Sequence, residues 1–220
     1  PGFITVHPTR VYGGPANYGS AFLPSSYQAT RIDDLPTTDG PAERKHPLPN
    51  ELLAGSQQLT QVLNQSLLNR GQAVPEVQGA IDSLGLSIRM QQTMPQVMNF
   101  SDEPQEVLDL YGVGQDGTDS FARQCLLARR FCEQGVRFVQ VTHSDTKVQW
   151  DQHGNLRGGH TANAREVDQP IAALIRDLRQ RGMLDETLVV WGTEFGRTPV
   201  AQGSDGRDHN PYGFTLWMAG

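Results

Sequence analysis

Two short apolar segments on either side of a predicted helix constrain the fold of this chain more than any other feature. Residues 136–141 and 187–191 have the length and composition of buried β-strands. Between them, apolar residues recur at helical spacing from Val167 to Leu178, and Gly182 then ends the helix. Strand, helix and strand in this order predict a βαβ unit, whose two strands run parallel within one sheet. The predicted fold class is therefore α/β, with a mainly parallel sheet and flanking helices.

The chain is expected to divide near residue 118. Residues 1–117 are predicted to form an irregular and helical cover region, and residues 118–220 an α/β core segment that carries the functional loops. Prolines are concentrated in residues 1–50, which hold eight of the 14, and this predicts little regular structure there. Three helices are expected in the rest of the cover region, at 51–70, 76–92 and 104–111.

The core segment is expected to begin with a helix that carries both cysteines and ends at Gly135. Cys125 and Cys132 are separated along this helix by a rise of about 10.5 Å, whereas a disulfide requires Cα atoms within about 7 Å. We therefore expect two free thiols that face the core. Residues 214–218 are expected to form a third strand.

Charge and hydropathy argue against nucleic acid as a partner and against a membrane-spanning segment in these residues. The 220 residues carry a formal net charge of −6, without clustered lysine or arginine, so the sequence offers no electrostatic basis for binding nucleic acid. No apolar run approaches the ~18 residues of a membrane-spanning helix. The chain starts at Pro1 and ends in an apolar run, so we expect it to be a fragment of a longer protein.

The loop after the strand at 136–141 and the loop after the strand at 187–191 hold the side chains best suited to metal binding and catalysis. In open α/β sheets, ligands bind beyond the carboxyl ends of the strands, so these two loops are expected to converge. Two carboxylates and two imidazoles would form an oxygen and nitrogen site that suits a divalent metal, Zn before Mn or Mg. The four predicted metal ligands, expected within one cluster of about 10 Å, are Asp151, His153, Glu194 and His209. His143 and His160 are lower-ranked alternatives.

Each of these short patterns also has a purely structural interpretation. Asp151 and His153 alone would fit a loop carboxylate beside a solvated histidine. Arg197 and Arg207 have planar guanidinium groups that could bind a phosphoryl or sulfuryl oxygen, and they are the predicted substrate ligands. Arg197 could instead form an ion pair with Glu194 or Asp208, and the tight turn around it favours this structural role.

Three motifs together resemble a known family. They are W-D-Q-H-G-N at 150–155, T-L-V-V-W-G-T-E-F-G-R-T-P at 187–199 and G-R-D-H-N-P at 206–211. They are similar to the family named domain of unknown function fifteen-oh-one, which is sulfatase-like and belongs with the alkaline phosphatase superfamily. The resemblance implies an alkaline phosphatase-like fold and an exported, metal-dependent hydrolase that acts on phosphate or sulfate esters of small molecules or polysaccharides.

The resemblance also assigns roles and reveals departures. Asp151, His153 and His209 resemble the ligands of one metal, and Glu194 takes the place of a ligand to a second metal. Phe195 stands where the superfamily has a second-site histidine, and Asp151 is followed by its histidine after two residues, where the phosphatases typically use four. The superfamily nucleophile is expected before residue 1, since Thr193 is a poor substitute, and the fragment alone is expected to be inactive.

Two further functions remain open at this point. Phe195 favours a non-catalytic binding or surface protein that retains the fold with a degraded metal site. A phosphoryl mutase would share the same residues as a hydrolase. The hydrolase is the leading hypothesis.

Overall fold

The computed structural model describes residues 2–7, 14–23, 27–33, 35–36, 94–144 and 150–220, together with Gly55, Gln58 and Val62. The helix expected at 76–92 lies outside the described residues. Of the helix expected at 51–70, only those three residues are described, and all three are helical.

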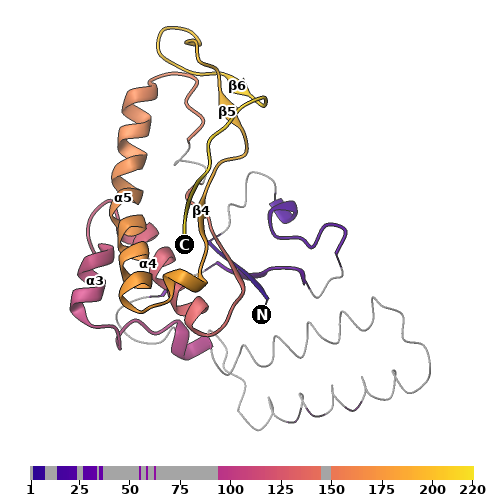
Figure 1. Cartoon of the computed structure of the whole chain (residues 1–220), viewed down its shortest axis with the longest axis vertical. Helices are drawn as coiled ribbons and strands as arrows, with labels where there is room; N and C mark the ends of the chain where they lie inside the picture. Colours follow the sequence, from indigo (N-terminus) through magenta and orange to yellow (C-terminus); the bar gives the residue numbers. More distant parts are fainter. Residues whose placement is uncertain are drawn as a thin grey trace.

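The described elements are short strands, longer α-helices and two short 3-10 helices, and the last four elements in the chain are strands (Figure 1). In chain order they are β1 (Phe3–Val6), the 3-10 helix η1 (Gly14–Asn17), β2 (Thr30–Ile32), α3 (Gln105–Tyr111), α4 (Asp119–Glu133), β3 (Phe138–Val141), α5 (Leu156–Gln180), the 3-10 helix η3 (Leu184–Glu186), β4 (Val189–Trp191), β5 (Gly196–Arg197), β6 (His209–Asn210) and β7 (Trp217–Ala219).

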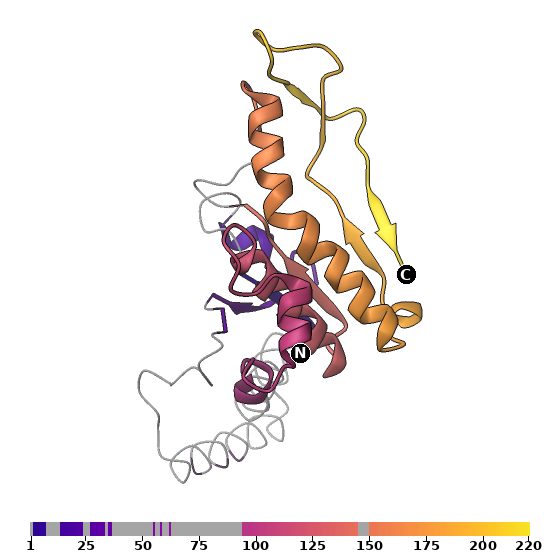
Figure 2. The ribbon, with the colours of Figure 1, turned by 90° about the vertical axis from the view of Figure 1, so that its left-hand side faces the viewer.

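A small parallel sheet in the order β2-β1-β3 forms one side of the core. The central strand β1 is the most deeply buried, since Ile4 and Val6 have no exposed surface. Helix α4 packs on β1 and β3, and it also contacts α3 and α5, so the three helices lie together beside the sheet (Figures 1 and 2). Helix α4 buries Phe121, Cys125 and Leu126 in this core. The predicted α/β class, with a parallel sheet and flanking helices, is thus confirmed at this level.

Two strands lie where the sequence predicts little regular structure. Residues 1–50 were expected to be irregular, yet they contain β1 and β2, which make up most of the parallel sheet. Both strands are short, and β1 pairs in register with β3, so that Ile4 lies opposite Val139. Local sequence carries little signal for such strands, because their stability comes from pairing and burial against distant residues.

The predicted βαβ unit is wrong. Strands β3 and β4 lie in different sheets: β3 pairs with β1, whereas β4 pairs antiparallel with β7, with Val190 opposite Met218. Strand β7 corresponds to the third strand expected at 214–218, and it returns to β4 after the long excursion that contains β5 and β6. Strand β4 reaches the core through Trp191, whose ring lies 6.4 Å from that of Phe121.

The helix predicted at 104–111 and the predicted helices of the core segment are confirmed with one shift. Helices α3 and α4 lie where expected, and Cys125 and Cys132 are both free. Helix α5 starts at Leu156, well before Val167, so His160 lies within the helix rather than in a loop before it. The early turns contain Gly158 and Gly159 and lack the apolar periodicity that marks the later ones. Among the described residues, none of the helices has the length and apolar character needed to cross a membrane.

A buried ionic network ties the helices together. The Arg129 side chain is only 2% exposed and forms ion pairs of 2.8 Å with Glu103, 2.7 Å with Glu133 and 3.0 Å with Asp177. Burial alone would lower the pKa of Arg129, but the surrounding carboxylates outweigh burial and raise it. Tyr111 donates its hydroxyl to Asp177 at 3.1 Å, and burial is the main cause that raises the pKa of that hydroxyl. The network connects the segment before α3 to α4 and α5.

Candidate metal centre

The ligand cluster lies where two segments far apart in the sequence meet. Asp151 and His153 belong to the loop that leads directly into α5, and His209 belongs to β6. Strands β5 and β6 pair antiparallel, with Arg197 opposite His209. The β5–β6 excursion lies near the end at which α5 begins, at the top of Figure 1.

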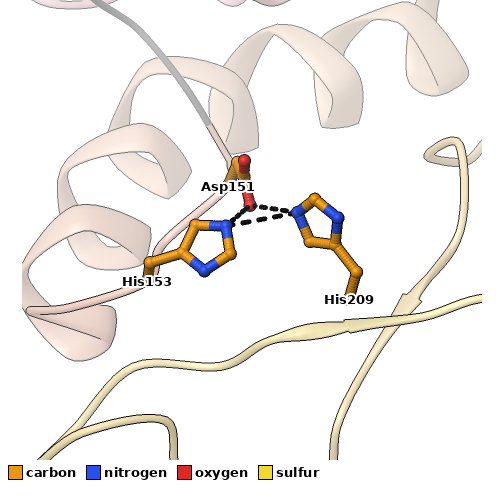
Figure 3. A group of neighbouring side chains, drawn as sticks. All are labelled: Asp151, His153 and His209. Carbon is orange, nitrogen blue, oxygen red and sulfur yellow. Dashed lines mark hydrogen bonds and ion pairs between the residues drawn. The ribbon is translucent and has the colours of Figure 1, made fainter.

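Three potential metal ligands converge on one point (Figure 3). His153 Nε2 lies 2.9 Å from Asp151 Oδ1, and His209 Nε2 lies 3.1 Å from the same oxygen. The two Nε2 atoms are 3.2 Å apart. The three side chains are between 41% and 46% exposed, so one side of the group faces solvent.

This geometry fits a divalent metal ion. Bonds of about 2.0–2.1 Å at tetrahedral angles place the ligand atoms of a zinc ion about 3.3 Å apart. The three observed separations of 2.9 to 3.2 Å are close to that spacing. Two imidazole nitrogens and one carboxylate oxygen are a donor set that zinc accepts. Three protein ligands with an open fourth position are typical of catalytic rather than structural sites.

A neighbouring amide orients His153 for this role. Gln202 Oε1 lies within hydrogen-bond distance of His153 Nδ1, and an amide oxygen can only accept. Nδ1 must then carry the proton, which leaves the lone pair of Nε2 directed at Asp151 and His209. Gln202 is itself held by paired backbone hydrogen bonds with Gly206, of 2.9 and 3.0 Å.

Glu194 does not join the three converging ligands. Its Oε1 accepts a hydrogen bond of 3.2 Å from Arg197 Nη2, and Arg197 Nη1 donates to Asp151 Oδ1. Of the four predicted ligands, the structure therefore brings three together and links the fourth through an arginine. The predicted contact between Arg197 and Glu194 is present. Asp208, the other predicted partner of Arg197, accepts a hydrogen bond from the backbone N–H of His209 at 2.8 Å.

Hydrogen bonds change the acidity of Asp151. Its partial desolvation raises the pKa, but hydrogen bonds from Arg197 and His209 outweigh desolvation and hold the pKa below the usual aspartate value. A carboxyl group with a depressed pKa contributes stability above its unfolded pKa and loses that contribution as the pH falls through its folded pKa. The contacts of Asp151 should therefore persist in mildly acidic solution.

A carboxyl NMR titration of the metal-free chain checks this expectation. The Asp151 carbon signal should titrate with a midpoint below the ~3.9 of an unperturbed aspartate. In an Arg197→Gln variant the midpoint should move up toward that value. A wild-type midpoint at or above it would contradict the interaction between Asp151 and its neighbours.

Backbone contacts hold the two ligand-bearing segments against each other. Arg207 N–H donates to the carbonyl of Gln152 at 3.0 Å, and Asn155 N–H donates to Asp205 Oδ1, also at 3.0 Å. Gly206 packs directly on the peptide of His153, since a Cβ atom at Gly206 would lie 2.0 Å from the His153 carbonyl oxygen. The absence of a side chain at Gly206 is what allows His153 and His209 to approach.

Replacing Gly206 with alanine should weaken zinc binding by at least about 10-fold, the lower end of the loss seen when groups that support metal ligands are altered. The added Cβ would meet backbone atoms of His153, which cannot rotate away, so the two segments must separate. Calorimetric zinc titration measures the effect. Gly213→Ala is the matched control, because a Cβ there meets nothing within 4 Å. Equal zinc affinities in the two variants would show that this close approach does not position the ligands.

The two alternative histidines have other partners. His143 Nδ1 accepts from Trp150 Nε1 at 3.0 Å, which leaves His143 Nε2 as the donor to Glu166 Oε2, also at 3.0 Å. Trp150 precedes Asp151, so His143 anchors the start of the ligand loop. The His160 ring packs edge-on against Trp150, with ring centroids 5.5 Å apart. Neither histidine belongs to the converging group.

The remaining predicted residues make local contacts. The Arg207 guanidinium donates to the carbonyl of Gly206 at 2.8 Å, so it stabilises its own turn. The Thr193 hydroxyl donates to the carbonyl of Phe195 at 3.0 Å, in agreement with a structural role. The Phe195 ring lies over His209, with ring centroids 4.6 Å apart. Gln202 was not predicted, because no local pattern distinguishes a glutamine that acts on a histidine 49 residues away.

The fold and the site define an α/β protein with a candidate metal centre of two histidines and one aspartate. The chain belongs to the family described as protein of unknown function (DUF1501), whose model matches residues 1–220. Searches of curated proteins and of solved structures found no match.

Proposed function

We propose that this protein is a divalent-metal-dependent hydrolase of phosphate or sulfate esters. The observation that carries the proposal is the convergence of Asp151 Oδ1, His153 Nε2 and His209 Nε2 on one solvent-facing point. The resemblance of the three sequence motifs to sulfatase-like proteins of the alkaline phosphatase superfamily supports the ester substrate, and it also supports export from the cell. Zinc is the preferred ion because of the two imidazole ligands, with manganese or magnesium as alternatives.

The side chains of the site would divide the work of such a reaction. His153 and His209 would supply neutral nitrogen ligands, and Asp151 would supply the negative charge. A bound divalent ion would polarise the ester and lower the pKa of a coordinated oxygen nucleophile. The open side of the group would admit a substrate. Arg197 is a cationic side chain in direct contact with Asp151, one of the three proposed metal ligands. A guanidinium at this position could bind the equatorial oxygens of a phosphoryl or sulfuryl group.

The test is an activity assay of the native gene product after removal of metal with a chelator. Aryl phosphate and aryl sulfate esters are supplied separately, with zinc, manganese or magnesium added back. The expected result is turnover that requires a divalent ion and disappears in a His209→Ala variant. Metal binding without turnover of either ester would contradict the proposal.

A non-catalytic metal-binding or surface protein is the second candidate, and Phe195 favours it. Phe195 occupies the sequence position at which the superfamily has a histidine ligand of the second metal, and its ring packs on His209. An aromatic side chain cannot coordinate a second ion, so a two-metal mechanism has one ligand fewer than expected. Zinc binding without turnover of either the phosphate or the sulfate ester in the assay above would support this alternative.

A further inference from the structure

Arg197 is bonded to the oxygen that a metal ion would use. Its Nη1 donates to Asp151 Oδ1, which is also the atom nearest to both imidazoles, at 2.9 Å from His153 Nε2 and 3.1 Å from His209 Nε2. A guanidinium and a divalent ion would therefore share a single carboxylate oxygen. The side chain of Arg197 is 22% exposed, so water screens this contact only in part.

Sharing that oxygen is unfavourable for electrostatic reasons. Two cations at hydrogen-bond and coordination distances from one atom repel each other at close range. A metal ion also draws electron density from Asp151, which makes its carboxylate a weaker acceptor for Arg197. Binding of the ion should thus favour departure of the guanidinium from Asp151.

Two other contacts would keep the guanidinium nearby after it leaves. Glu194 Oε1 lies 3.2 Å from Arg197 Nη2, and the guanidinium carbon lies 5.4 Å from the centroid of the Phe195 ring. The carboxylate would retain a hydrogen bond and the ring would retain a cation–π contact. Arg197 would then have free donors beside the metal position.

We propose that a divalent ion and Arg197 compete for Asp151, and that metal binding releases the guanidinium to bind a tetrahedral oxyanion. The anion class is the phosphate or sulfate group of an ester, so the inference rests on the proposed function and defines the order of binding. The protein binds the metal first, and the anion site forms only in the loaded protein. Glu194 is a positioning residue for Arg197 and not a metal ligand.

The principal test is the zinc affinity of an Arg197→Gln variant, measured by calorimetry on the chelator-treated chain. If the guanidinium competes with zinc, its removal should tighten zinc binding by about 10-fold, within the range of coupling between two sites. The matched control is Arg157→Gln, which removes the same charge from an exposed position in the first turn of α5. Arg157→Gln should change the affinity by less than about 2-fold, because screening by water and salt weakens exposed charges.

Each outcome of this test decides one hypothesis or both. Tighter binding in Arg197→Gln alone supports the competition. Unchanged or weaker binding in Arg197→Gln overturns the competition and leaves the metal site of the proposed function intact. Failure of every form to bind zinc, manganese or magnesium overturns both.

A second measurement uses the wild-type chain, in case the variant does not fold. Zinc should tighten the binding of inorganic sulfate, and sulfate should tighten the binding of zinc by the same factor, because linkage is reciprocal. Zinc should also shift the NMR signals of the Arg197 guanidinium as its bond to Asp151 breaks. A guanidinium signal that zinc leaves unchanged, although zinc binds, would overturn the inference.

Discussion

Replacing Arg129 with methionine should lower the free energy of unfolding by about 3–5 kcal/mol, the usual cost of removing one partner from a buried ionic network. Methionine fills much of the same space but leaves the carboxylates of Glu103 and Asp177 without their shared cation. Those two side chains are only 5% and 4% exposed, so water cannot replace the lost partner. Urea denaturation followed by circular dichroism measures the change.

The control for this prediction is Arg176→Met, an exposed arginine on α5. Its effect should stay within about 0.5 kcal/mol, as for surface substitutions in general. A loss of less than about 1 kcal/mol in Arg129→Met would contradict the central role of this network.

Replacing His209 with alanine should weaken zinc binding by at least about 100-fold, beyond the 10- to 100-fold loss caused by altering groups that only support metal ligands. The variant would lack one of the three donor atoms, and the two that remain both come from the loop before α5. Because His209 is nearly half exposed, the metal-free variant should retain its fold. Calorimetric titration of zinc into the chelator-treated chain measures the affinity.

The matched control is His7→Asn, which removes an exposed histidine far from the ligand cluster in sequence. His7 has a φ of 47°, and asparagine tolerates this left-handed conformation. Zinc affinity in His7→Asn should equal that of the wild type. Comparable losses in both variants would indicate nonspecific binding to surface histidines.

The sequence alone determined the helices of the core segment and the residue types of the candidate site. Periodic apolar residues predicted α4 and most of α5, because helical periodicity is a property of one segment and needs no partner. Asp151, His153 and His209 were predicted as ligands from their chemistry and from their positions after predicted strands, and the structure places all three together. The early turns of α5 were missed, since glycines and polar residues there interrupt the periodicity.

Only the tertiary structure decided how the strands pair and which groups share a hydrogen bond. The sequence of a short apolar strand does not specify which other strand it pairs with, so β3 could have paired with either β4 or β1. In the structure β3 pairs with β1, and β4 pairs with β7. The contact of Arg197 with Asp151 depends on the pairing of β5 with β6 and on the close approach of Gly206 to His153. These contacts join residues about 50 positions apart, where local propensity has no influence and packing, chain connectivity and hydrogen-bond satisfaction select the arrangement.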